Sequence, residues 1–291
     1  MKFGVNLPIS TASATPAVVA SAARHAEALG FSSLWVGDHV AMPVEYQSRY
    51  PYSEDGRMTW DAQTPWLDPL MTLLWAAAAT QRIRVGTAVL VPAMRPAVLL
   101  AKQLATLDRL SGGRLTFGVG MGWLAEEFAL LGQSFERRGA RMAEAVEVLR
   151  ACWAPGLVQF KGEFHDLPSF ACEPKPAQGS DLPVLIGGTG DLMLKRVASL
   201  DCGWLPIEMA PEAFSERRAF LVKELQAAGR RYEDLTVVMQ SDARSFTPEL
   251  AATYAGLGVG EVILEVSWRR QSVDQAMAEM EAVAVRFGMN S

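Results

Sequence analysis

The chain has 291 residues; half of them are hydrophobic, a fifth are charged, and the formal net charge is −5 at pH 7. This length suits one (β/α)8 barrel of about 250 residues with insertions. The negative charge argues against a nucleic acid or an anionic membrane as a partner. Three cysteines without a CxxC spacing fit a reducing compartment and no disulfide framework.

The beginning of the chain has one basic residue but no apolar stretch of the kind found in signal peptides. No apolar run in the sequence approaches the ~20 residues that a membrane-spanning helix needs. We therefore expect a cytoplasmic protein with no membrane partner.

Short apolar runs alternate with helix-like segments along the whole chain. Pro8 ends the first run, Pro16 opens the first helix, and Gly30 stops that helix. A small hairpin is expected within 158–164. The expected strands are 3–7, 33–36, 83–90, 115–119, 184–186, 203–206, 235–239 and 262–266. The expected helices are 16–29, 69–80, 96–110, 135–153, one after Gly190 with Met193, Val197 and Leu200 in register, 211–228, 247–257, and a last one that begins at a capping box of Ser272 and Gln275.

Strands that alternate with helices predict an α/β fold with a parallel sheet, and eight such units are enough to close it. We expect a (β/α)8 TIM barrel with insertion loops. Because no linker or shift in composition divides the chain, residues 1–291 are expected to form one domain. The working groups of such barrels lie at the carboxyl-terminal ends of the strands.

Glycines gather after the fifth expected strand, at Gly187, Gly188 and Gly190, with Thr189 between them. Glycine lets backbone N–H groups approach an anion closely, and the following helix adds partial positive charge. The motif fits a phosphate cradle, although it lacks the P-loop pattern. A tight turn between strand and helix would need the same glycines. Its place late in a barrel favours phosphate binding.

Asp38 and His39 close the second expected strand. A histidine there would face the barrel mouth and could donate a proton, while Asp38 sets its tautomer or contacts cofactor hydroxyls. A structural histidine that caps the strand is the alternative. His25 and His165 are expected to be structural. No spacing among the three histidines matches a metal site, so we expect no metal.

The fourth expected strand ends in a glycine-rich stretch that includes Gly120 and Gly122. With Ala125 these residues fit a dinucleotide-binding variant, GxGxxA, but no second parallel strand follows promptly. We expect a strand end against which a flat ring can pack, and close packing of strand and helix is the alternative. Glu126 and Glu127 then open a helix, where acidic side chains stabilise the N-terminus.

Aromatic residues are concentrated in the loops and at strand ends. The longest loop, 40–68, carries three tyrosines, and a loop of this length in a compact domain usually acts as a lid or binding loop. The aromatic side chains favour a flat, apolar ligand, although packing remains the simpler role for any one of them. The candidate substrate-contacting residues are Trp60, Trp66, Trp123 and Trp204.

These motifs together resemble the bacterial luciferase-like superfamily of flavin- or deazaflavin-dependent oxidoreductases. The resemblance covers essentially the whole chain, is most specific at 105–123, and is closest to the actinobacterial type that uses coenzyme F420. The residues that carry it are Gly37-Asp38-His39, Arg95-Pro96-Ala97, Ala101-Lys102-Gln103, Thr106 to Arg114, Gly118-Val119-Gly120, Gly122-Trp123, Glu127-Phe128, Ile186-Gly187-Gly188 and Gly203-Trp204.

The resemblance implies a ring cofactor at the barrel mouth, with its phosphate in the glycine cradle. It implies that residues 86–89 form a bulge against the ring, with a non-prolyl cis peptide between Ala88 and Val89. His39 matches the active-site histidine of the family, and a homodimer is expected. The implied cofactor-binding residues are Asp38, His39, Thr87, Ala88, Val89, Gly120, Gly187, Gly188, Thr189 and Gly190.

Our leading hypothesis is an oxidoreductase that transfers a hydride between coenzyme F420 and a small, largely apolar organic substrate, with His39 as proton donor. Because Trp123 stands where the glucose-6-phosphate dehydrogenases of the family have an acidic residue, sugar-phosphate oxidation is not expected. One alternative is an FMN-dependent monooxygenase that uses reduced flavin and oxygen. The other is a non-catalytic flavin- or deazaflavin-binding protein.

Overall fold

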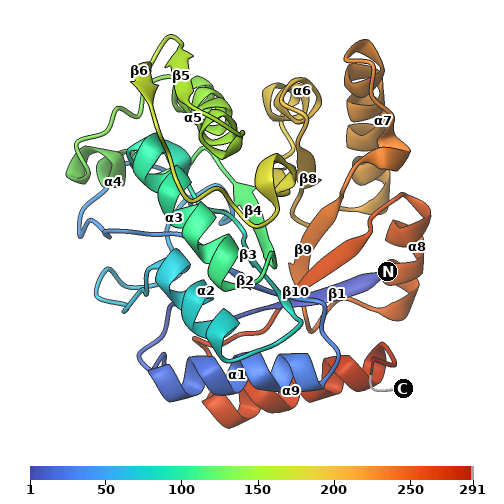
Figure 1. Cartoon of the computed structure of the whole chain (residues 1–291). Helices are drawn as coiled ribbons and strands as arrows, with labels where there is room; N and C mark the ends of the chain where they lie inside the picture. Colours follow the sequence, from blue (N-terminus) through green and yellow to red (C-terminus); the bar gives the residue numbers. More distant parts are fainter. Residues whose placement is uncertain (290–291) are drawn as a thin grey trace.

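The computed structural model describes residues 1–289, and its centre is a barrel of eight parallel strands (Figure 1). The strand order is β8-β7-β4-β3-β2-β1-β10-β9. Bridges from Trp204 to Val237 and from Ile207 to Gln240 join the two ends of this sheet. The predicted (β/α)8 barrel with insertion loops is therefore confirmed. The strands are β1 (Lys2–Asn6), β2 (Ser33–Val36), β3 (Arg84–Thr87), β4 (Leu115–Val119), β7 (Val184–Gly187), β8 (Gly203–Leu205), β9 (Val238–Asp242) and β10 (Glu261–Glu265).

The helices surround the barrel, and three of them begin at a side-chain cap followed by proline. Thr15, Asp68 and Thr247 each accept a backbone N–H bond at a helix start, and a proline follows each of them. Among residues 1–289, no helix is long and apolar enough to cross a bilayer. The helices are α1 (Pro16–Ala28), α2 (Pro69–Ala78), α3 (Ala97–Leu110), α4 (Ala125–Leu130), α5 (Arg138–Trp153), α6 (Asp191–Ser199), α7 (Pro211–Ala227), α8 (Pro248–Gly256) and α9 (Val273–Arg286), with short 3-10 turns at Pro92–Met94, Gly179–Asp181 and Tyr232–Asp234.

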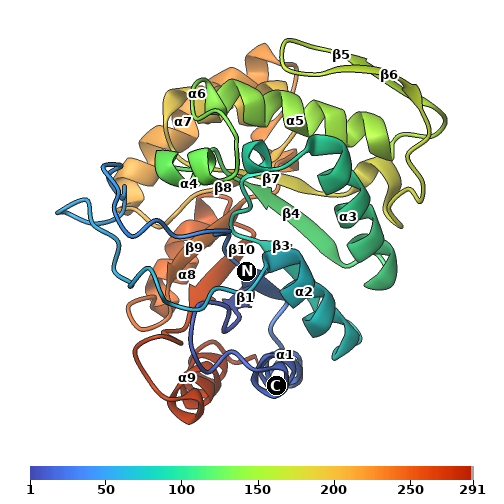
Figure 2. The same ribbon diagram turned by 90° about the vertical axis from the view of Figure 1, so that its left-hand side faces the viewer.

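The first and last elements of the described residues lie together on one side of the barrel. Helices α1 and α9 lie side by side there (Figures 1 and 2), and β1 pairs with β10 in parallel register. Ser272 and Gln275 form the predicted capping box at the start of α9.

Two predicted strands differ from the structure by more than one residue at an end. The strand predicted at 83–90 stops at Thr87, because the chain leaves the sheet and returns only as a single bridge at Leu90. The strand predicted at 235–239 begins at Val238 and runs on to Asp242, because a 3-10 turn at Tyr232–Asp234 precedes it.

The helix predicted at 135–153 begins at Arg138, after Arg137 adopts a left-handed conformation with φ of 54°. A separate helix, α4, precedes it, and Glu126 and Glu127 lie in its first turn, as the sequence predicted. The hairpin predicted within 158–164 is longer, with strands β5 (Val158–Lys161) and β6 (Asp166–Phe170).

Trp35 on β2 fills the barrel below its mouth. Its side chain is buried and packs with a layer of apolar side chains from the other strands. Gly4 and Gly86, on the two flanking strands, make room for it: a Cβ at either position would lie within 2.7 Å of the indole. Because this layer closes the interior, space for a ligand remains only above it, at the carboxyl-terminal ends of the strands.

Candidate active site

A cavity of about 1330 Å³ opens at the carboxyl-terminal ends of the barrel strands. Small-molecule sites usually measure about 300–1,000 Å³, so this cavity has room for a ring cofactor and a substrate together. All of the predicted site residues except Thr87 and Trp204 line it. They are Asp38, His39, Trp60, Trp66, Ala88, Val89, Gly120, Trp123, Gly187, Gly188, Thr189 and Gly190.

Thr87 and Trp204, which were predicted to contact ligands, are fully buried and do not line the cavity. The Thr87 hydroxyl donates to the carbonyl of Gly118 at 2.7 Å and accepts the N–H of that residue at 3.1 Å, so it joins β3 to β4. Trp204 stacks on Phe214 with ring centroids 5.0 Å apart. Its indole Nε1 donates to the carbonyl of Gly188 at 2.8 Å. Both residues therefore support the site from behind.

His39 is held by the buried carboxylate of Glu127, a residue that was predicted only to lie at a helix start. Nδ1 of His39 lies 2.8 Å from Oε2 of Glu127, whose side chain is 3% exposed. The other oxygen, Oε1, accepts the N–H groups of Val40 and Ala41 at 2.6 and 3.2 Å. Because Nδ1 is engaged and Nε2 has no partner within residues 1–289, Nε2 is the ring atom of His39 that is free for a ligand.

Asp38 does not contact His39 and instead anchors a loop. Its carboxylate makes a two-pronged ion pair with Arg95, at 2.6 and 2.7 Å, and accepts the N–H of Val91 at 3.0 Å. The prediction that Asp38 sets the tautomer of His39 is therefore wrong, because Glu127 occupies that position. A bidentate pair of this kind fixes the end of β2 relative to the chain that follows β3.

The peptide between Ala88 and Val89 is cis, as the resemblance implied, and both residues line the cavity. Val89 packs against two neighbouring strand ends that carry glycine. A Cβ at Gly120 would lie 2.5 Å from Cγ2 of Val89, and one at Gly187 would lie 2.9 Å from Cγ1. These glycines therefore make room for Val89, whose side chain forms an apolar part of the cavity wall.

The glycine cradle, residues 187–190, lies between β7 and α6. Gly188 has φ of +110°, a conformation that favours glycine. Within residues 1–289, the N–H groups of Thr189 and Gly190 have no hydrogen-bond acceptor. Unpaired N–H groups at the start of a helix suit an anion such as phosphate.

Aromatic side chains of the loop 40–68 enclose His39. Trp66 meets the imidazole edge-on, with centroids 4.8 Å apart, and the centroid of Trp60 lies at 5.7 Å. Arg269 places its guanidinium 4.7 Å from the Trp60 centroid. The indole N–H groups of Trp60 and Trp66 are buried, and neither has an acceptor within the described residues. A ligand that carries an acceptor would satisfy them.

The cavity suits a flavin or a deazaflavin. Val89 supplies an apolar face for a ring, and the cradle supplies N–H donors for a phosphate. Across residues 1–289, no group of three or more His, Cys, Asp or Glu side chains is placed to hold a metal ion.

The fold and the cavity at the ends of its strands define an enzyme of the (β/α)8-barrel class. A histidine–carboxylate pair lies in this cavity, which suits a ring cofactor. Residues 1–245 match the luciferase-like monooxygenase family. The chain belongs to this family of oxidoreductases and monooxygenases.

Two similar proteins cover most of the chain. An uncharacterized protein of Mycobacterium tuberculosis (strain ATCC 25618 / H37Rv) is 35% identical over 289 residues, 99% of each chain. An F420-dependent glucose-6-phosphate dehydrogenase of Amycolatopsis mediterranei is 31% identical over 223 residues, 73% of this chain and 60% of the relative.

Solved structures share the barrel over its whole length. A monooxygenase from Streptomyces bottropensis has a TM-score of 0.78 at 22% identity and covers 98% of both chains. An F420-dependent secondary alcohol dehydrogenase also has a TM-score of 0.78, at 18% identity, and the match covers 100% of this chain and 99% of the other. At these identities the likeness shows the common fold.

Proposed function

We propose that the protein is an oxidoreductase that transfers a hydride between coenzyme F420 and a small, largely apolar organic substrate. The pairing of His39 with Glu127 inside the cavity carries the proposal, because it presents one free imidazole nitrogen to a ligand. The cradle and Val89 support binding of a phosphorylated ring. The 31% identity to an F420-dependent dehydrogenase favours the deazaflavin.

When bound, the deazaflavin supplies or accepts the hydride. In the reduction of a carbonyl, protonated His39 gives the proton of Nε2 to the oxygen while the carbon gains the hydride, so an alcohol forms; oxidation reverses both transfers. Glu127 keeps the imidazole in place and stabilises its protonated form. Trp60 and Trp66 cover the pair and exclude water from the reacting atoms.

Titration of the purified protein with F420 and with FMN, followed by ring fluorescence, tests the cofactor. We expect saturable binding of F420 and weaker binding of FMN; tight FMN binding without F420 binding would overturn the proposal. A His39→Ala variant should keep its affinity for F420 and lose turnover. Unchanged turnover in that variant would remove His39 from the mechanism.

An FMN-dependent monooxygenase is the second candidate, favoured by the match of residues 1–245 to the luciferase-like monooxygenase family. Deazaflavin has a carbon in place of a ring nitrogen and reacts poorly with oxygen. Oxygen uptake with reduced FMN therefore separates the two candidates. Uptake that requires both the protein and an organic substrate would support the monooxygenase.

We also propose that the protein works in the cytoplasm as a homodimer. Met71 and Trp75 on α2, and Leu99 and Leu110 on the adjacent α3, are exposed apolar side chains. A second copy would cover them. Light scattering after size-exclusion chromatography measures the mass, and a monomer at micromolar concentration would contradict the dimer.

A further inference from the structure

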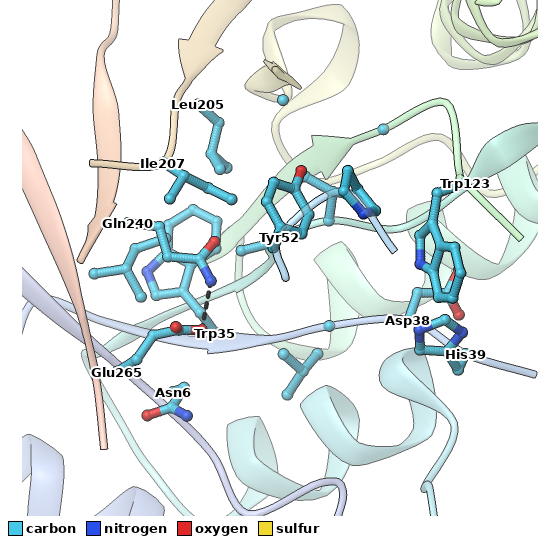
Figure 3. A pocket seen from close by; sticks show the side chains of 18 of the residues that line it. Asn6, Trp35, Asp38, His39, Tyr52, Trp123, Leu205, Ile207, Gln240 and Glu265 are labelled. Atoms are coloured by element: carbon cyan, nitrogen blue, oxygen red, sulfur yellow. Dashed lines mark hydrogen bonds between the residues drawn. The ribbon is translucent and has the colours of Figure 1, made fainter. Parts of the chain in front are cut away.

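The end of the cavity away from His39 is polar. Figure 3 shows Glu265 and Gln240 on the opposite side of the cavity from His39 and Trp123. Glu265 ends β10 and Gln240 lies on the neighbouring strand β9. Both side chains line the cavity, as does the apolar Ile207 beside them. A ligand that reaches from one end to the other therefore meets a second set of polar atoms.

Glu265 and Gln240 bind each other and leave two acceptor atoms free. Nε2 of Gln240 donates to Oε1 of Glu265. Within residues 1–289, no donor contacts Oε2 of Glu265 or Oε1 of Gln240, and Glu265 forms no ion pair. Arg269, the cation nearest along the chain, places its guanidinium over Trp60 instead.

The carboxylate of Glu265 is exposed to the cavity and can receive a donor from a ligand. Burial by the surrounding protein raises the pKa of Glu265, although its side chain is open to the cavity; Gln240 and Arg269 lower this pKa only in part, and Asp242 raises it further. A ligand that fills the cavity displaces water from the carboxylate and the amide oxygen, and a donor on the ligand would replace the hydrogen bonds lost.

The backbone next to Glu265 is fixed before any ligand binds. Oδ1 of Asn6 accepts the N–H of Val266 at 2.7 Å, and Nδ2 of Asn6 donates to the carbonyl of Val266 at 3.1 Å. This two-way bond ties the end of β1 to the end of β10. The carboxylate therefore stands on a rigid element, which reduces the entropy lost when a ligand binds.

We propose that Glu265 and Gln240 form a subsite for a hydrogen-bond-donating group of the substrate, an ammonium or a hydroxyl, remote from the carbon that reacts beside His39. This inference rests on the proposed function, which places the reacting end of the substrate beside His39. Two acceptors without a paired cation disfavour a carboxylate or phosphate at this place. The substrate is then amphipathic, with an apolar body along the cavity and a donor at its far end.

Three probes that share one ring and differ in their head group test the subsite: cyclohexylmethylamine, cyclohexylmethanol and cyclohexanecarboxylate. Each is titrated by calorimetry at pH 7 into the full chain loaded with F420. The amine and the alcohol should bind at least about tenfold more tightly than the carboxylate. Glu265→Gln keeps the shape and should weaken amine binding about tenfold. Glu249→Gln, which removes an exposed charge on α8, should leave all three affinities unchanged.

A second variant should increase the preference for the amine. Gln240→Glu adds a carboxylate and should strengthen amine binding relative to the alcohol. Equal affinities for amine and carboxylate in the wild type would overturn the subsite. So would an unchanged amine affinity in a Glu265→Gln protein that keeps the wild-type melting temperature, or no binding of the amine and the alcohol.

The affinity for F420, measured on the same preparations, separates the two proposals. A protein that binds F420 but does not distinguish the head groups refutes the subsite alone. A protein that fails to bind F420 refutes the proposed function, whereas the preference for the amine can still be measured on the chain without cofactor.

Discussion

Glu127 bridges His39 and the first two residues of the loop that covers it, using one carboxylate oxygen for each. A single buried charge therefore sets both the orientation of the imidazole and the start of the loop 40–68. The neighbouring Glu126 accepts the N–H groups of Gln47 and Ser48, further along the same loop. Two adjacent residues of α4 thus fasten the loop, and only Glu127 contacts the imidazole.

Replacing Glu127 by Gln should lower kcat about 10–100-fold and leave KM and the affinity for F420 within about twofold. The neutral amide keeps the shape of the side chain but cannot stabilise a protonated imidazole. Steady-state kinetics with F420, followed by its absorbance, measure the change. Glu126→Gln is the matched control and should retain kcat. A Glu127→Gln enzyme with wild-type kcat would contradict the proposed positioning of His39.

Gly120→Ala should destabilise the protein by about 1–3 kcal/mol, because the added methyl group meets Val89 in a packed wall. The displaced Val89 should also weaken the binding of the cofactor ring. Denaturant unfolding and F420 titration measure the two effects.

The double variant with Val89→Ala provides the control for that clash. Removing the valine methyls should restore much of the stability lost in Gly120→Ala, so the two changes should be coupled rather than additive. Strict additivity would show that the clash with Val89 is not the cause.

Trp204→Phe should weaken the binding of phosphate-bearing cofactor and spare the binding of its phosphate-free form. Phenylalanine keeps the stack on Phe214 but removes the Nε1 donor that holds the carbonyl of Gly188. The expected loss of stability is about 1 kcal/mol. Titrations with F420 and with its phosphate-free deazaflavin core give the comparison. An equal loss for both ligands would argue against a phosphate in the cradle.

The barrel could be predicted because its signals are local. Proline at helix starts, glycine at helix ends and apolar runs of strand length recur along the chain, and each is readable within a few residues. Where the boundaries were wrong, tertiary contacts decided: the single bridge at Leu90, for example, depends on pairing with Val119. The cis peptide at Ala88 was available only through the family resemblance.

The site could be predicted only in part, because its polar pairs join distant segments. Glu127 lies 88 residues from His39 in the sequence. Its place in the first turn of a helix was already a sufficient reason for an acidic residue there. Glu265 and Gln240 meet through the register of two strands, which one sequence does not reveal. Trp204 was misplaced because a three-residue strand is too short to show which side chains face inward.

The β5–β6 hairpin should loosen in acid because it is held by the carboxylate of Glu144. This carboxylate accepts the N–H groups of Glu163, Phe164 and His165, and it bonds Nδ1 of His165 at 2.8 Å. Burial raises the pKa of Glu144, but the bonds from His165 and the backbone outweigh it and bring the pKa below its ordinary value of 4.5. The folded protein therefore takes up this proton less readily than the unfolded chain.

The stabilisation by Glu144 is thus fully present above about pH 4.5 and is lost as the pH falls through the lowered, folded-state pKa. Hydrogen exchange of the hairpin amides, measured from pH 7 downward and corrected for intrinsic rates, should show protection that falls in this acid range. Glu144→Gln should have weaker protection at pH 7 and no further loss in acid, whereas Glu147→Gln, an exposed residue of the same helix, should behave as the wild type. Acid loss that persists in Glu144→Gln would assign the effect to another group.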